Sequence, residues 1–93
     1  MNPHMRNRIA AGDFARVTLD EETTFSGYIA ADPADPSVFR MDGYVLGAAG
    51  HLEGVSLRLA DDDIHQIQFL PEPPVFVDAE GHDLVMVRGF FPG

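Results

Sequence analysis

The stretch that decides the fold is ARVTLDEETTFSGYI, residues 15–29. In residues 15–19, and again in residues 25–29, the larger apolar side chains fall on every second position, which is the period of a strand with one buried face. Acidic and threonine residues between the two runs predict a polar hairpin turn. Gly27 lies inside the second strand, where a missing side chain marks a sharp bend or a close approach of backbones. The pattern predicts a bent hairpin, which is how a small barrel begins.

The segment before this hairpin, residues 1–12, predicts a short helix. Pro3 stands near its start and Gly12 is placed as its C-terminal cap. A helix of this length is marginal in water on its own. We therefore expect Met5 and Ile9 to dock on the barrel or on a neighbouring subunit.

The segments after the hairpin predict three further strands, at residues 38–42, 55–59 and 64–69. Residues 43–54 contain four glycines and predict a long, mobile loop. This loop lacks the lysine and the following helix that a phosphate-binding loop requires. Pro71, Pro73 and Pro74 end the fifth strand, and an extra hairpin is expected from residues 75–77 and 84–88.

These elements fit one domain, residues 1–93, because a second core would have too little chain to bury. We expect an all-β fold, namely a small, strongly bent, five-stranded barrel of SH3 type. The N-terminal helix spans residues 1–12, the barrel residues 13–70 and a C-terminal hairpin extension residues 71–93.

The composition restricts the function. Six arginines, no lysine and fifteen acidic residues give a net charge of −9, which opposes non-specific binding to phosphate backbones. The lack of lysine is most economically explained by coding or salt adaptation.

Cysteine is absent, which excludes disulfides, thiolate chemistry and cysteine zinc sites. No run approaches the roughly 18 apolar residues of a membrane span and no signal peptide begins the chain, so we expect a cytoplasmic protein.

Two spaced patterns resemble the motifs of the Sm-like (LSm) proteins, over about residues 12–69. The first motif is matched in type and spacing, with the aspartate one residue early, by Leu19, Phe25, Gly27, Ile29 and Asp32. The second motif is echoed by Leu57, Arg58, Ile64 and Ile67. The resemblance implies a helix followed by five short strands, the second of them bent. The Rho-inhibiting regulators, which act by binding protein, have a similar barrel.

The chain also departs from the family pattern. Glu22 replaces the glycine of the first hairpin, and Leu59 follows Arg58 where the family has glycine. The RNA-contacting asparagine of the family is absent, and Ser37 is its nearest equivalent. If the chain binds RNA as its relatives do, the site lies in the loops after the second and fourth strands and uses Ser37, Phe39, Arg40 and Arg58. In the alternative interpretation Phe39 belongs to the core and both arginines pair with carboxylates.

The leading hypothesis is a non-catalytic, oligomeric binding module that acts through protein interaction or ring assembly. RNA binding is the alternative. The strands at residues 55–59 and 64–69 lack proline and lysine, the usual guards of a free sheet edge. We expect them to pair with a neighbouring chain in a closed homo-oligomer. The apolar side chains along these edges are Val55, Leu57, Leu59, Ile67 and Phe69.

No catalytic residue, metal or cofactor is predicted. The cluster of Asp61, Asp62, Asp63 and His65 offers oxygen and imidazole ligands, but its spacing matches no established metal site and is typical of a solvated turn. The four histidines show no zinc-ligand spacing. The three serines carry no nucleophile-elbow pattern, so hydrolase chemistry lacks support.

Overall fold

The computed structural model describes residues 2–91, and its first strands form the predicted hairpin. Strands β1 (Asp13–Thr18) and β2 (Thr24–Ala31) pair antiparallel, with Val17 opposite Phe25. The Asp20 carboxylate accepts hydrogen bonds of 2.9 Å from the backbone N–H groups of Glu22 and Thr23, which closes the turn. The acidic turn is therefore shaped by its own side chains.

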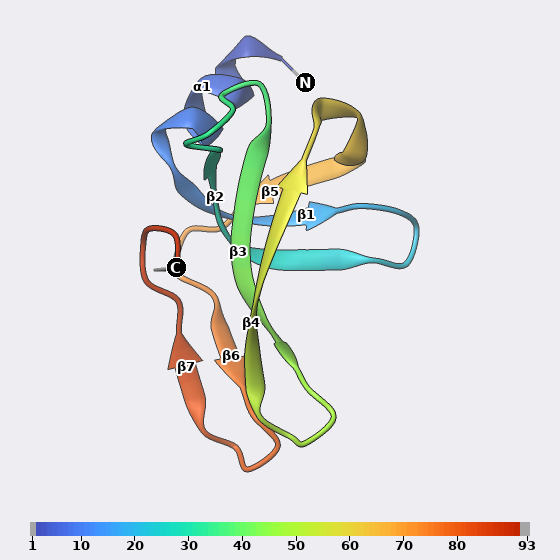
Figure 1. The fold of residues 1–93 in the computed structure, drawn as a ribbon, viewed down its shortest axis with the longest axis vertical. Coiled ribbons are helices and arrows are strands. Elements are labelled where there is room, and N and C mark those ends of the chain that lie inside the picture. Colours follow the sequence, from blue (N-terminus) through green and yellow to red (C-terminus); the bar gives the residue numbers. More distant parts are fainter. Residues whose placement is uncertain (1, 92–93) are drawn as a thin grey trace.

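Gly27 lies directly before the point where β3 joins β2, while the β1–β2 pairing continues to Ile29. A Cβ atom at this position would overlap the carbonyl oxygen of Asp42 and lie 2.9 Å from its carbonyl carbon. Ala15 is opposite Gly27 on one side, while the β2–β3 pairing begins one residue later, at Tyr28. The close backbone approach expected at Gly27 is thus confirmed. Figure 1 shows β2 curving from the direction of β1 to the direction of β3.

The prediction of a mobile loop over residues 43–54 is wrong. Strands β3 (Phe39–Leu46) and β4 (Leu52–Leu59) form a long hairpin in which eight residues of each strand are paired. Gly43 and Gly54 lie within these strands. A Cβ at Gly43 would come within 2.5 Å of the Ser26 carbonyl oxygen and 2.8 Å of the Phe25 ring, and one at Gly54 within 3.3 Å of the Phe91 ring. These glycines make room for a neighbouring strand and for packed aromatic rings, and they do not mark a loop.

Strand β5 (Gln66–Phe69) pairs with β1 and completes a sheet of order β4-β3-β2-β1-β5. A single 3₁₀ turn, η1 (Asp61–Asp63), connects β4 to β5, as the acidic run predicts. β4 and β5 are therefore the two outer strands of the sheet. The five antiparallel strands predicted from the sequence are confirmed, with β3 and β4 longer than expected.

The core lies between the sheet and helix α1 (Pro3–Ala11). Asn2 caps the helix by accepting a 2.9 Å hydrogen bond from the Met5 N–H, and Gly12 ends it at φ 87°. Ile9 is completely buried, as expected of a docked short helix, and Met5 is half-buried. The cluster of buried residues contains Ile9, Ala15, Val17, Ile29, Phe39, Met41 and Leu59.

The predicted C-terminal hairpin is present, formed by β6 (Val75–Val77) and β7 (Asp83–Val85). Figure 1 shows it beside the far half of the β3–β4 hairpin. Two interactions join them: the Tyr44 and Phe76 rings lie 5.4 Å apart, and the Ala79 N–H donates a 3.0 Å hydrogen bond to the Gly50 carbonyl. The molecule is thus mostly β, with one five-stranded sheet, one two-stranded sheet and a short helix among residues 2–91.

Candidate functional site

The two outer strands of the sheet carry the side chains predicted for assembly. Leu59 is buried, while Val55, Leu57, Ile67 and Phe69 are half-buried. Leu57, Ile67 and Phe69 pack against the core cluster. Within residues 2–91 neither β4 nor β5 pairs with another strand on its outer side. The core therefore reaches both edges of the sheet.

The loop after β2 and the end of β4 meet through an ion pair. Arg58 donates a 2.8 Å hydrogen bond to Asp32, which also accepts one of 2.8 Å from the Ala34 backbone N–H. The Ala34 hydrogen bond, with the Arg58 guanidinium as a smaller cause, holds the pKa of Asp32 below its usual value. The hydroxyl and backbone N–H of Ser37 both donate to Asp35, and they lower the pKa of that carboxyl. Two ionised carboxylates thus flank Arg58.

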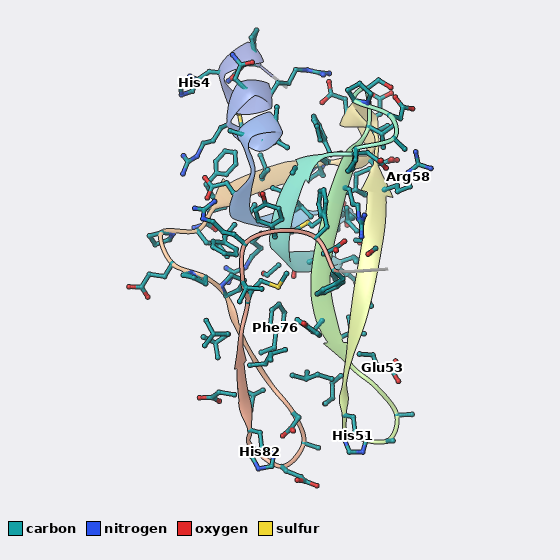
Figure 2. All side chains as sticks on the ribbon, turned by 60° about the vertical axis from the view of Figure 1, so that its left-hand side comes forward. His4, His51, Glu53, Arg58, Phe76 and His82 are labelled. Carbon is teal, nitrogen blue, oxygen red and sulfur yellow. The ribbon has the colours of Figure 1, made fainter. Side chains whose placement is uncertain are left out.

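Of the four residues predicted to contact RNA, Arg40 and Arg58 are cross-strand neighbours and Ser37 lies in the loop next to Arg58, whereas Phe39 lies in the core. Ser37 and Arg58 belong to the loop cluster just described, and Arg58 is 62% exposed at the end of β4 (Figure 2). Phe39 is 4% exposed and belongs to the core, as the alternative interpretation expects. Arg40 lies opposite Arg58 in the β3–β4 register, but its guanidinium pairs with Asp42. Both arginines therefore pair with carboxylates, as the alternative interpretation expects.

Asp42 forms a buried polar centre that the sequence did not reveal. Its side chain is fully buried and accepts two hydrogen bonds from Arg40, of 3.1 and 3.2 Å. The Ser56 hydroxyl donates to it at 2.7 Å, and the Phe91 backbone N–H donates at 2.7 Å from 49 residues away. This carboxylate ties the C-terminal segment to the middle of the sheet.

Aromatic rings strengthen the same attachment. The Arg40 guanidinium lies 4.4 Å from the centre of the Phe90 ring, which also contacts Tyr28 edge-on at 5.6 Å. Phe91 lies 5.0 Å from Tyr44. The alternation of Arg40, Asp42 and Tyr44 on one strand face was a usable signal, because an aspartate inside a strand needs donors. Its C-terminal partners could not be read from local sequence.

A hollow of about 270 Å³ lies beside β5, lined by Met5, Asp61, Ile64, His65, Gln66 and Ile67. One Asp61 oxygen pairs with Arg6. The other oxygen is buried and has no hydrogen-bond partner among the described residues. The hollow is open and of mixed polarity, so it is a shallow feature of the edge.

The acidic turn has a structural role. The Asp63 carboxylate accepts a 2.8 Å hydrogen bond from the Ala60 N–H and so closes the 3₁₀ turn. No group of three metal-ligating side chains gathers anywhere in residues 2–91. His4 lies on α1 at one end of the molecule, whereas His51 and His82 lie at the hairpin tips of the other end (Figure 2).

Comparison with known proteins finds no similar one: no family model, no curated protein and no solved structure matches the chain. Across the described residues, no helix has the length and hydropathy needed to cross a membrane.

Proposed function

We propose that the chain is a non-catalytic protein-interaction module, built on an Sm-like barrel, that assembles into a homo-oligomer through the outer strands of its sheet. The observation that carries this proposal is the pair of unpaired edges. β4 offers eight residues and β5 four, and proline and lysine are absent from both. An unpaired row of backbone donors and acceptors is a template for a strand from another chain.

The apolar side chains support pairing of β4 in one copy with β5 in the next. Leu57 on β4, and Ile67 and Phe69 on β5, are half-buried extensions of the core. Joining the two edges would remove the remaining apolar surface of these side chains from water. Because the two edges differ, the contact is head-to-tail, and a ring is its closed form.

The sheet order and the Asp32–Arg58 pair support the Sm-like barrel within this proposal. A helix precedes β1, β2 bends at a glycine, and the loop after β2 meets the end of β4 through an ion pair. The residues involved are those that carry the resemblance in the sequence. Protein binding is favoured over RNA binding because Arg40 and Arg58 are both neutralised by aspartates on a chain of charge −9.

Two lysine substitutions test the assembly. Val55→Lys places a charge on the β4 edge at a residue outside the core cluster, and it should give monomers in light scattering. Ala48→Lys, in the exposed turn of the same hairpin, adds the same charge and should leave the oligomer intact. Equal masses for the two variants would contradict edge pairing. Retention of the wild type on immobilised RNA at low salt would favour RNA binding instead.

A further inference from the structure

The outward face of the β6–β7 hairpin is an exposed aliphatic surface. Val75, Val77 and Val85 are 53%, 52% and 56% exposed, and Val87, two residues further on, is 74% exposed. Val75 is directly opposite Val85 in the register, so the two side chains lie on one face. These four residues are called the valine face.

The opposite face of the hairpin explains why the valines point outward. Phe76 alternates with Val75 and Val77, and it packs against Tyr44 (Figure 2). Met86 alternates with Val85 and Val87 and is 2% exposed. Leu84, opposite Phe76, is 36% exposed, so this second face is only partly covered by the body of the molecule, whereas the four valines are each more than half exposed. A single exposed valine is ordinary, but three on the outward face of a short hairpin, with Val87 exposed just beyond the end of β7, mark an interaction surface.

The charges around the valine face are mainly negative. Residues 71–91 contain four carboxylates, those of Glu72, Asp78, Glu80 and Asp83, and one arginine. Asp83 is opposite Val77 and shares its face. The arginine, Arg88, is turned to the body of the molecule, where it donates a 3.1 Å hydrogen bond to the Gly12 carbonyl. A basic partner would complement this rim.

A second copy of the chain does not fit the valine face. Two such faces would bring their acidic rims together, which costs affinity. The occupant therefore has to bring complementary charge.

We propose that the valine face docks a partner protein through an extended segment whose aliphatic centre is flanked by lysine or arginine. The aliphatic residues, at alternate positions of the segment, cover Val75, Val77, Val85 and Val87. The flanking cations meet the acidic rim. This names the kind of partner for the protein-interaction module and rests on that proposed function, although it does not depend on the oligomer.

Three labelled nine-residue peptides test the chemistry by fluorescence anisotropy at low salt. The first has three valines alternating with threonine in its centre and two lysines at each end. The second replaces lysine by glutamate, and the third replaces valine by serine. The wild type should bind the first peptide at least tenfold more tightly than either of the others. If the serine peptide binds as tightly as the first peptide, charge alone explains the binding and the proposal is overturned. If the glutamate peptide binds as tightly as the first peptide, the proposal is overturned as well.

Matched variants of the protein locate the site. The double variant Val75→Thr, Val85→Thr keeps the β-branched shape and strand preference of exposed residues, so it should fold. It should bind the first peptide at least tenfold more weakly. Val45→Thr, an equally conservative change at a valine 40% exposed on β3, should bind it unchanged. Unchanged binding by the double variant would overturn the proposal.

One further comparison separates this inference from the proposed assembly. The edge variant Val55→Lys should still bind the first peptide, because β4 and the valine face are different surfaces. If instead the Val75→Thr, Val85→Thr variant loses self-association that the wild type shows, the valine face is an interface between copies and the partner proposal is wrong.

Discussion

The five-stranded sheet and the C-terminal hairpin differ in the interactions that stabilise them. The sheet has a core of seven buried residues from α1 and β1 to β4, and the half-buried Ile67 and Phe69 of β5 pack against it. Beyond residue 70, by contrast, Met86 is the only apolar side chain in the described chain that is buried. The hairpin depends on aromatic contacts and on the Asp42 carboxylate instead.

The sheet is thus stabilised by its own core, whereas the hairpin is stabilised by its contacts with the body of the molecule. A two-stranded hairpin is marginal in water without a body to pack on. Substitutions at the attachment of the hairpin should therefore lower the free energy of unfolding more than substitutions elsewhere.

The largest effect is expected for Asp42→Ala. Removing this carboxylate leaves the Arg40 guanidinium, 26% exposed, without its partner, and leaves Ser56 and the Phe91 N–H without an acceptor. We expect a loss of about 3 kcal/mol in the free energy of unfolding, measured by urea denaturation. Asp62→Ala, at an exposed aspartate, should change it by less than about 0.5 kcal/mol. Similar midpoints for the two variants would show that the polar centre does not hold the regions together.

The second-largest loss in the free energy of unfolding is expected from a substitution inside the sheet. Gly27→Ala forces a Cβ onto the backbone of Asp42 and Gly43, which cannot move without breaking the β2–β3 pairing. We expect a loss of about 2–3 kcal/mol, again in urea. Gly54→Ala is the matched strand glycine, and there the Cβ meets only the Phe91 ring at 3.3 Å. Its cost should be well under half of that for Gly27→Ala, and a reversed order would contradict the bend at Gly27.

Met86→Ala should loosen the hairpin more than the sheet. Its cost is expected near about 2 kcal/mol, at the low end for such a deletion, because exposed neighbours can close over the cavity. Amide hydrogen exchange by mass spectrometry should rise in residues 71–91 and stay nearly unchanged in residues 13–46. Equal acceleration in both regions would mean that sheet and hairpin unfold as one unit.

The smallest effect is a pH dependence confined to the hairpin turn. The backbone N–H groups of His82 and Glu80 donate to Asp78, and the His82 bond in particular holds the pKa of this carboxyl below its usual 3.8. A lowered pKa in the folded state means stability that is present above pH 3.8 and lost as the pH falls through the lowered value. The thermal midpoints of wild type and Asp78→Ala should therefore differ at pH 6, and the difference should shrink as the pH falls below 3.8 through the lowered pKa. A difference that grows on acidification would contradict this sign.

The sheet could be predicted where its signal is local. The alternation around Val17 and Phe25 and the single Gly27 define β1, β2 and the bend, because a half-buried strand repeats every second residue. The same reasoning failed at Gly43 and Gly54, which look like loop residues. The lack of a side chain is explained at Gly43 by the Ser26 carbonyl oxygen and the Phe25 ring, and at Gly54 by the Phe91 ring, all of which approach from elsewhere in the chain.

The candidate surfaces were predictable to different degrees. The unguarded edges of β4 and β5 followed from residue types alone. The Asp42 centre did not, because its donors come from three separate segments. The valine face could not be predicted from the sequence, for a different reason. Val75, Val77 and Val85 read as ordinary strand residues, and only the tertiary structure tells which face of a hairpin is covered.

The central claim, assembly through apolar sheet edges, is tested most directly by the mass of the wild-type chain as salt is raised. Each chain carries a charge of −9, so neighbouring copies repel one another. Salt shortens the range of that repulsion from about 8 Å at physiological ionic strength to about 3 Å at 1 M, while apolar contacts persist. Sedimentation at micromolar concentration should give a multiple of 10.2 kDa, with the oligomer fraction rising toward 1 M salt. A mass of 10.2 kDa throughout, or dissociation as salt rises, would contradict the account.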